Sequence, residues 1–150
     1  MEQITSGAYG PIVVLDAGER FDPEIDHVVT IGWNGRGRFP NIRIALNGDS
    51  SPPPLILERG RTHRFRIVNI GAAARFNFTL RQDSTIMTWS PAAKDGFDLT
   101  QFLRTPRPAV QLVSTGETFD AEWTPRRKGE YLLTVVNSGR LYNKMKVIVR

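Results

Sequence analysis

The fold of this chain is decided by the stretch Thr62-His-Arg-Phe-Arg-Ile-Val-Asn-Ile70. In an extended backbone Phe65 and Ile67 lie on one face, and Arg64 and Arg66 lie on the other. Alternation with a period of two is typical of a β-strand that buries one face and exposes the other. We therefore expect a half-buried strand here.

A second alternating run follows a short link of small residues, Gly71–Ala74. Phe76, Phe78 and Leu80 occupy every second position of this run, so they share one face. The link is short enough to turn the chain. We expect the two strands to lie next to each other at the centre of an antiparallel sandwich.

The remaining sequence continues the same pattern of short apolar or alternating runs separated by turn dipeptides such as Asn34-Gly35 and Asn47-Gly48. Residues 98–102 could form either one helical turn or irregular coil. About ten strands in all, with almost no helical periodicity, predict an all-β sandwich or barrel with Greek-key connections. Besides the two runs above and a run from Leu55 that Gly60 ends, strands are expected at 11–15, 26–33, 42–46, 85–89, 110–113, 118–123, 131–136 and 144–149.

Composition limits the classes of protein to which the chain can belong. It has 150 residues, of which 40% are hydrophobic, and this predicts one globular domain spanning residues 1–150. The absence of cysteine excludes disulfides, thiolate metal ligands and a cysteine nucleophile. No segment is long and apolar enough to span a bilayer, and Met1–Ser6 lacks the features of a signal peptide, so we expect no membrane partner.

The net charge of +5 is unevenly distributed. Residues 1–26 are acidic, whereas residues 35–81 contain nine arginines against only Asp49 and Glu58. One interpretation is that the alternate positions of exposed strands happen to carry arginine. The other is a basic surface that attracts an anionic polymer or an acidic partner.

Residues with the chemistry of a catalytic or metal site are few. His27 and His63 are the only histidines, and they lie far apart in the sequence on different expected strands, whereas a copper or zinc site needs three or four converging ligands. Asp95 and Asp98 could form a carboxylate pair, but Lys94-Asp95-Gly96 is better explained as a turn. Aromatic residues at alternating positions indicate core packing in preference to a stacking platform for bases or sugars. The sequence predicts no catalytic, cofactor-binding or metal-binding residue.

Five short motifs carry a resemblance to a known family: Gly10-Pro-Ile-Val-Val14, Leu46-Asn-Gly48, Gly60 with Arg64-Phe-Arg-Ile-Val-Asn-Ile70, Trp89 with Lys94-Asp-Gly96, and Gly116-Glu-Thr-Phe-Asp120. In this order and spacing they resemble the second cupredoxin (plastocyanin-like) domain of multicopper oxidases, the laccase-like oxidoreductases. The resemblance implies a cupredoxin-like Greek-key β-sandwich over residues 11–150, with residues 1–10 connecting it to another domain. It also implies a periplasmic or secreted parent protein.

Departures from the family pattern concern the copper ligands. Copper-bearing domains of this family carry a His-Cys-His run at the position of Thr134-Val-Val136, and a type 1 centre needs the Cys and two His. We therefore expect no cofactor in this chain, and copper only in the parent protein. Val135 should point into the core and fill the volume of the missing cysteine, leaving a packed position with His63 away from it.

Three functions remain open on the sequence alone. The resemblance implies a copper-free structural domain that spaces and orients copper-bearing domains of a longer oxidoreductase. Its partners would be the other cupredoxin domains, with a homo-oligomer as a further arrangement. The alternative is a stand-alone basic module for an anionic polymer or a protein, although nucleic acid is not the expected ligand. An enzyme in its own right is the third class, for which we find no nucleophile or acid–base pair.

Overall fold

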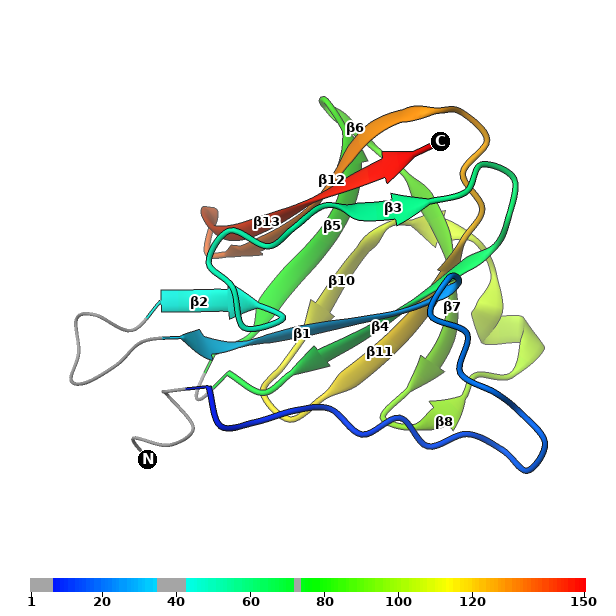
Figure 1. Cartoon of the computed structure of the whole chain (residues 1–150), viewed down its shortest axis with the longest axis horizontal. Helices are drawn as coiled ribbons and strands as arrows, with labels where there is room; N and C mark the ends of the chain where they lie inside the picture. Colours follow the sequence, from blue (N-terminus) through cyan, green and yellow to red (C-terminus); the bar gives the residue numbers. More distant parts are fainter. Residues whose placement is uncertain (1–6, 35–42, 72–73) are drawn as a thin grey trace.

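Two β-sheets pack face to face in the computed structural model of the chain, which describes residues 7–34, 43–71 and 74–150 (Figure 1). One short 3₁₀ helix, η1 (Gln101–Arg104), is the only helix among these residues, and none of their helices is long and apolar enough to cross a membrane. The strands are β1 (Asp26–Asn34), β2 (Arg43–Leu46), β3 (Leu55–Leu57), β4 (His63–Asn69), β5 (Phe76–Gln82), β6 (Thr85–Ile86), β7 (Thr88–Lys94), β8 (Phe97–Asp98), β9 (Arg107–Pro108), β10 (Val110–Val113), β11 (Thr118–Trp123), β12 (Gly129–Asn137) and β13 (Arg140–Val149).

The first sheet, sheet A, has the order β2-β1-β4-β11-β7-β8, with β9 on β7, and the second, sheet B, has the order β10-β5-β12-β13-β3, with β6 on β5. The two central strands β4 and β5 therefore do not pair, and the expectation that they would lie side by side is wrong. They face each other across the core, because the link between them crosses from one sheet to the other. Two pairs, β1–β4 and β3–β13, are parallel, so the sheets are mixed and not purely antiparallel.

The predicted alternation of the two central strands is confirmed. Buried and half-buried residues alternate along the whole of β4, and Phe65 and Ile67 are fully buried. On β5, which belongs to the opposite sheet, Phe76, Phe78 and Leu80 are also buried. Removing each large side chain of this kind from water stabilises the fold by roughly 1.5–3 kcal/mol, and these residues belong to the core shared by the two sheets.

Asn69, at the end of β4, holds the crossover between the sheets in place. Its fully buried amide donates to the carbonyl oxygens of Ala74 and Val113, both at 2.9 Å, and its Oδ1 accepts from the Gly71 amide at 3.0 Å. A Cβ at position 71 would lie 3.2 Å from this Oδ1, which explains the glycine. Residues 72–73, the middle of the predicted link, lie outside the described residues.

Asn143 closes the opposite edge of the sandwich. It lies on β13 of sheet B, and its buried side chain donates to the carbonyl oxygens of Ile44 on β2 and Asp49, at 3.1 and 3.3 Å. These bonds join sheet B to the β2 turn across 99 and 94 residues of sequence. The two sheets are thus tied by a polar contact as well as by the core.

The expected strand at 11–15 is not formed. Residues 8–16 contain no regular secondary structure, and they belong to a segment of residues 7–21, here called the strap, that runs outside sheet A before the chain enters β1 (Figure 1). Elsewhere the predicted turns are confirmed, since Asn47 and Asp95 have positive φ angles, as do the glycines that follow them. Gly35 of the expected Asn34-Gly35 turn lies outside the described residues.

The structure brings the two histidines together, so the expectation of two scattered residues is wrong. His27 Nε2 on β1 lies 3.0 Å from His63 Nδ1 on β4, and the rings stack with centroids 5.2 Å apart. His63 Nε2 lies 3.0 Å from the carbonyl oxygen of Glu58, which can only accept. In the neutral pair His63 Nδ1 is therefore the acceptor and His27 Nε2–H the donor. The parallel pairing of β1 with β4 creates this contact. The alternation of residues within each strand does not predict it, because alternation does not show which strands are neighbours.

The pKa of His27 is lowered to about 4, first by burial and then by repulsion from His63, against a weaker opposing attraction to Asp26 and Asp22. The unfolded chain protonates this ring at its ordinary pKa of 6.5, so the folded state loses stability as the pH falls from 6.5 towards 4. With allowance for solvent screening, this loss amounts to about 2 kcal/mol.

We expect His27→Gln to remove this pH dependence, because an amide can donate to His63 Nδ1 without titrating. The free energy of unfolding of both proteins, measured by urea denaturation between pH 7 and pH 4, should converge as the pH falls. Equal losses in the two proteins over this range would show that His27 does not carry the effect.

Candidate functional site

Val135 lies where the resemblance to the multicopper oxidases places a copper-binding cysteine. It belongs to β12, which runs between β5 and β13 in sheet B, and it is fully buried opposite Phe78 and Asn143. The prediction that Val135 points into the core of a central strand is confirmed. Thr134 on the opposite side of the strand donates to the carbonyl oxygen of Thr79 at 3.3 Å and is a structural residue of the sheet.

A groove of about 610 Å³ opens at the same end of β12, beside the β12–β13 turn. Ile44, Phe76, Asn137 and Leu141 are among the residues that line it, but Val135 is not. Val135, at the position that the resemblance assigns to the cysteine, is thus packed, as expected. The neighbouring groove was not foreseen, because it depends on how β2 and the β12–β13 turn meet.

The histidine pair offers no metal site of the usual kind. No group of three or more His, Cys, Asp or Glu residues that could hold a metal ion is found within the described ranges. His63 uses both ring nitrogens, one for the Glu58 carbonyl and one for His27. We assign the pair to the packing of β1 against β4.

Arg64 and Arg66 do not form a solvated basic face, so both sequence interpretations need correction for these two arginines. Arg66 Nη2 lies 2.7 Å from Asp26 Oδ1 on β1, and its Nη1 lies 3.0 Å from Asp120 Oδ2 on β11. Arg64 Nε lies 2.8 Å from the same Asp120 oxygen. These four residues, here called the ionic ladder, cross three adjacent strands on the outer face of sheet A. The side chains of Arg66, Asp26 and Asp120 are only 10–14% exposed.

The ionic ladder balances burial against charge pairing. Burial raises the pKa of Asp120 above its ordinary value, although Arg64 and Arg66 both act to lower it. Burial alone would lower the pKa of Arg64, but the carboxylates of Asp120 and Asp98 together raise it. Both guanidinium groups therefore favour the charged form of Asp120 and oppose the effect of burial.

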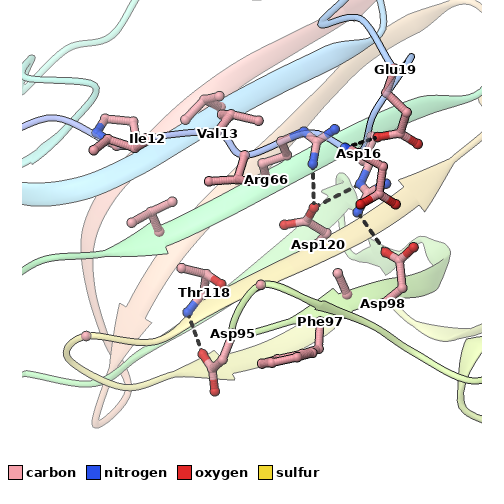
Figure 2. A pocket seen from close by; sticks show the side chains of 18 residues that line it. Ile12, Val13, Asp16, Glu19, Arg66, Asp95, Phe97, Asp98, Thr118 and Asp120 are labelled. Atoms are coloured by element: carbon pink, nitrogen blue, oxygen red, sulfur yellow. Dashed lines mark hydrogen bonds and ion pairs between the residues drawn. The ribbon is translucent and has the colours of Figure 1, made fainter.

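A groove of about 630 Å³ lies between the strap and the outer face of sheet A, and Figure 2 shows its lining. The ionic ladder residues Arg64, Arg66 and Asp120 form part of its floor. The lining contains five carboxylates against two guanidinium groups, so the groove is negative in a chain with a net charge of +5. It therefore does not suit an anionic ligand. The residues that line it are Pro11–Val14, Asp16, Glu19, Val28, Arg64, Arg66, Val68, Ala93, Asp95–Asp98, Gly116, Thr118 and Asp120.

The two aspartates singled out in the sequence both line this groove but have separate roles. Asp95 accepts hydrogen bonds from the Thr118 amide and the Lys94 ammonium, each at 2.9 Å, and the Lys94 contact is the main reason why its pKa is lowered. Asp98 lies 3.4 Å from Arg64 Nη2. Asp95 stabilises a turn, as predicted, and Asp98 pairs with an arginine, so each carboxylate has its own partner.

Exposed apolar side chains flank this groove. Ile12 and Val14 of the strap are 90% and 86% exposed, and Phe97 on the opposite rim is 80% exposed. Exposed apolar side chains around a groove are a feature shared by interaction surfaces and ligand-binding grooves. The apolar run Ile12-Val-Val14 could have indicated this surface from the sequence. The sequence analysis instead predicted a strand of the sandwich there.

Comparison with known proteins gives matches in structure only. No protein-family model and no curated protein matches this sequence. A solved multicopper oxidase superposes with a TM-score of 0.68 and 13% identity over 85% of this chain and 44% of its own. The blue copper oxidase from Nitrosomonas europaea gives 0.62 and 17% over 84% and 44%. A McoA multicopper oxidase variant from the hyperthermophile Aquifex aeolicus gives 0.62 and 19% over 83% and 30%.

These comparisons establish the fold. All three of these proteins are copper oxidases, and this chain spans less than half the length of each of them. The sandwich observed here, with its central β12 and its crossover between sheets, corresponds to one part of such a protein. The chain thus has the fold of a multicopper-oxidase-like cupredoxin domain.

Proposed function

We propose that this chain is a copper-free structural cupredoxin domain of a longer multicopper-oxidase-like oxidoreductase. Its role is to space and orient the copper-bearing domains of that protein. The observation that carries the proposal is Val135, which is fully buried at the position that the resemblance assigns to the cysteine ligand. The coverage of 30–44% of the matched oxidases supports a place within a longer chain.

The residues present do not fit a type 1 copper centre. Such a centre uses a cysteine and two histidines, and the chain has no cysteine. The side chain of Val135 has no atom that binds a metal, and His63 Nδ1 already accepts from His27 at 3.0 Å. Copper chemistry in the parent protein would therefore use ligands outside this chain.

A structural role agrees with how the polar residues of the domain are used. Asn69 and Asn143 bind backbone carbonyls that fix the crossover and the sheet edge. The ionic ladder holds neighbouring strands of sheet A together. Each of these groups is satisfied by the protein itself, which favours a rigid spacer over a catalyst that presents groups to a substrate.

The natural reading frame around this sequence tests the proposal directly. We expect it to encode further cupredoxin sequence on both sides of the chain, rich in histidine at the copper ligands. A frame that encodes no other cupredoxin domain would overturn the proposal.

We expect the chain to retain no copper. After incubation with excess copper and dialysis, elemental analysis should give far less than one copper per chain, and the protein should be colourless. His27→Gln serves as the matched control, because it removes the one ring nitrogen of the pair that bonds to no other described residue. One copper per chain in the unsubstituted protein, and none in His27→Gln, would contradict the copper-free assignment.

We also expect weak, non-selective binding of nucleic acid, because the ionic ladder neutralises Arg64 and Arg66. Exposed basic residues elsewhere would give a dissociation constant on the order of 10⁻⁴ to 10⁻⁶ M at physiological salt. Fluorescence anisotropy with labelled single-stranded DNA of two unrelated sequences measures this. Sub-micromolar binding that distinguishes the two sequences would instead favour a stand-alone binding module.

A further inference from the structure

A pocket of about 400 Å³ opens at the edge of the sandwich, between β1 of sheet A and the β13–β3 edge of sheet B (Figure 1). β2 pairs only with residues 31–34 of β1, so none of the described strands covers the first half of β1 at this edge. The walls of the pocket are mainly apolar and include Phe21, Pro54, Leu55 and Met145. Its size and lining are those of a site for a small molecule.

Three of the four polar side chains that line this pocket already have partners within the protein. Asp26 belongs to the ionic ladder. The Asn47 side chain bonds to the β1 backbone through both its oxygen and its nitrogen, at 2.7 and 3.0 Å. Asp49 accepts from the Ser51 amide at 2.8 Å. The fourth polar side chain is His27.

His27 presents a hydrogen-bond acceptor to the pocket. The carbonyl of Glu58 can only accept, so His63 Nε2 donates to it, and His27 Nε2 in turn donates to His63 Nδ1. The pKa of His27, lowered to about 4, keeps the ring neutral at pH 7. Its Nδ1 therefore carries a lone pair and no proton. A single backbone carbonyl thus fixes the protons on both rings.

This acceptor has no partner. The His27 side chain is only 6% exposed, and its Nδ1 bonds to no other residue that the structure describes. In the same part of the chain, the fully enclosed side-chain atoms without a partner are the indole nitrogens of Trp33 and Trp89. Nδ1 of His27 is not among them, so it keeps an opening, and His27 lines this pocket. A buried acceptor without a donor costs free energy that a bound donor would recover.

We infer that this pocket binds a small, neutral, apolar molecule with one hydrogen-bond donor, of the size of an alicyclic alcohol, and that the donor bonds to His27 Nδ1. The apolar walls accommodate the hydrocarbon part. An anion is disfavoured, because Nδ1 has no proton to donate and Asp26 and Asp49 lie at the same pocket. A molecule that offers only acceptors would place a lone pair against the lone pair of Nδ1. The site lies within this chain, so its test does not depend on the proposed function.

Cyclohexanol and cyclohexanone form a matched pair of probes, because they have the same ring and differ in the hydroxyl donor. We expect cyclohexanol to bind this chain at pH 7 with a dissociation constant on the order of 1 mM, given its few atoms. It should also shift the ¹⁵N resonance of His27 Nδ1 in the NMR spectrum. Cyclohexanone should bind about fivefold to tenfold more weakly, through loss of one hydrogen bond, and leave that resonance in place.

Three results of this titration would overturn the inference. They are the absence of saturable binding of cyclohexanol, equal affinity for the alcohol and the ketone, and an unchanged Nδ1 resonance in the cyclohexanol complex. Tighter binding of cyclohexylammonium than of cyclohexanol would also overturn it, because the carboxylates and not His27 would then select the ligand.

Leu55→Trp tests the location, because a larger side chain at this half-buried position of β3 should fill the pocket. We expect it to abolish the binding of cyclohexanol. Ile56→Trp is the matched control, since Ile56 is the next residue of the same strand, 44% exposed, and does not line the pocket. It should bind cyclohexanol as the unsubstituted chain does. Unchanged binding in a folded Leu55→Trp variant would show that the alcohol binds elsewhere.

Discussion

Sheet A depends on the ion pairs that Arg66 forms with Asp26 and Asp120. Its guanidinium joins Asp26 on β1 to Asp120 on β11, so one side chain ties the strands on both sides of β4. The β1–β4 pair is parallel and has no hairpin to set its register. Removing one partner from a buried ion pair leaves an uncompensated charge at a cost of roughly 3–5 kcal/mol. The ladder therefore specifies which strands are neighbours as well as holding them together.

The same register places the histidines side by side. Asp26 of β1 pairs with Arg64 of β4 and His27 with Phe65, which places Asp26 on the outer face and His27 on the inner face. The outer face of sheet A carries charged residues because the strap covers it only in part. The inner face is buried, and there the two histidines form hydrogen bonds with each other and with the Glu58 carbonyl. The charged ionic ladder on the outer face and the neutral histidine pair on the inner face thus both result from the alignment of β1 with β4.

Much of the fold could be predicted from local patterns. The alternation of Phe65 and Ile67 and the Asn47-Gly48 turn are encoded within a few residues, and the structure confirms them. The pairing of His27 with His63 and the place of residues 11–15 depend on contacts far apart in the sequence. A period of two shows that a segment can be a strand, but it does not show which strand lies beside it.

Asn143 has a consequence for how the chain reaches this fold. Its side chain binds the carbonyl of Ile44, 99 residues earlier, and β13 also pairs with β3. Contacts of such long range must pay the entropy of closing a large loop before they stabilise anything. During synthesis the first half of the chain must wait for β13 before its sheet edge is closed. In a longer protein, an early sandwich would remain open to wrong strand partners until the ribosome has produced nearly this whole domain.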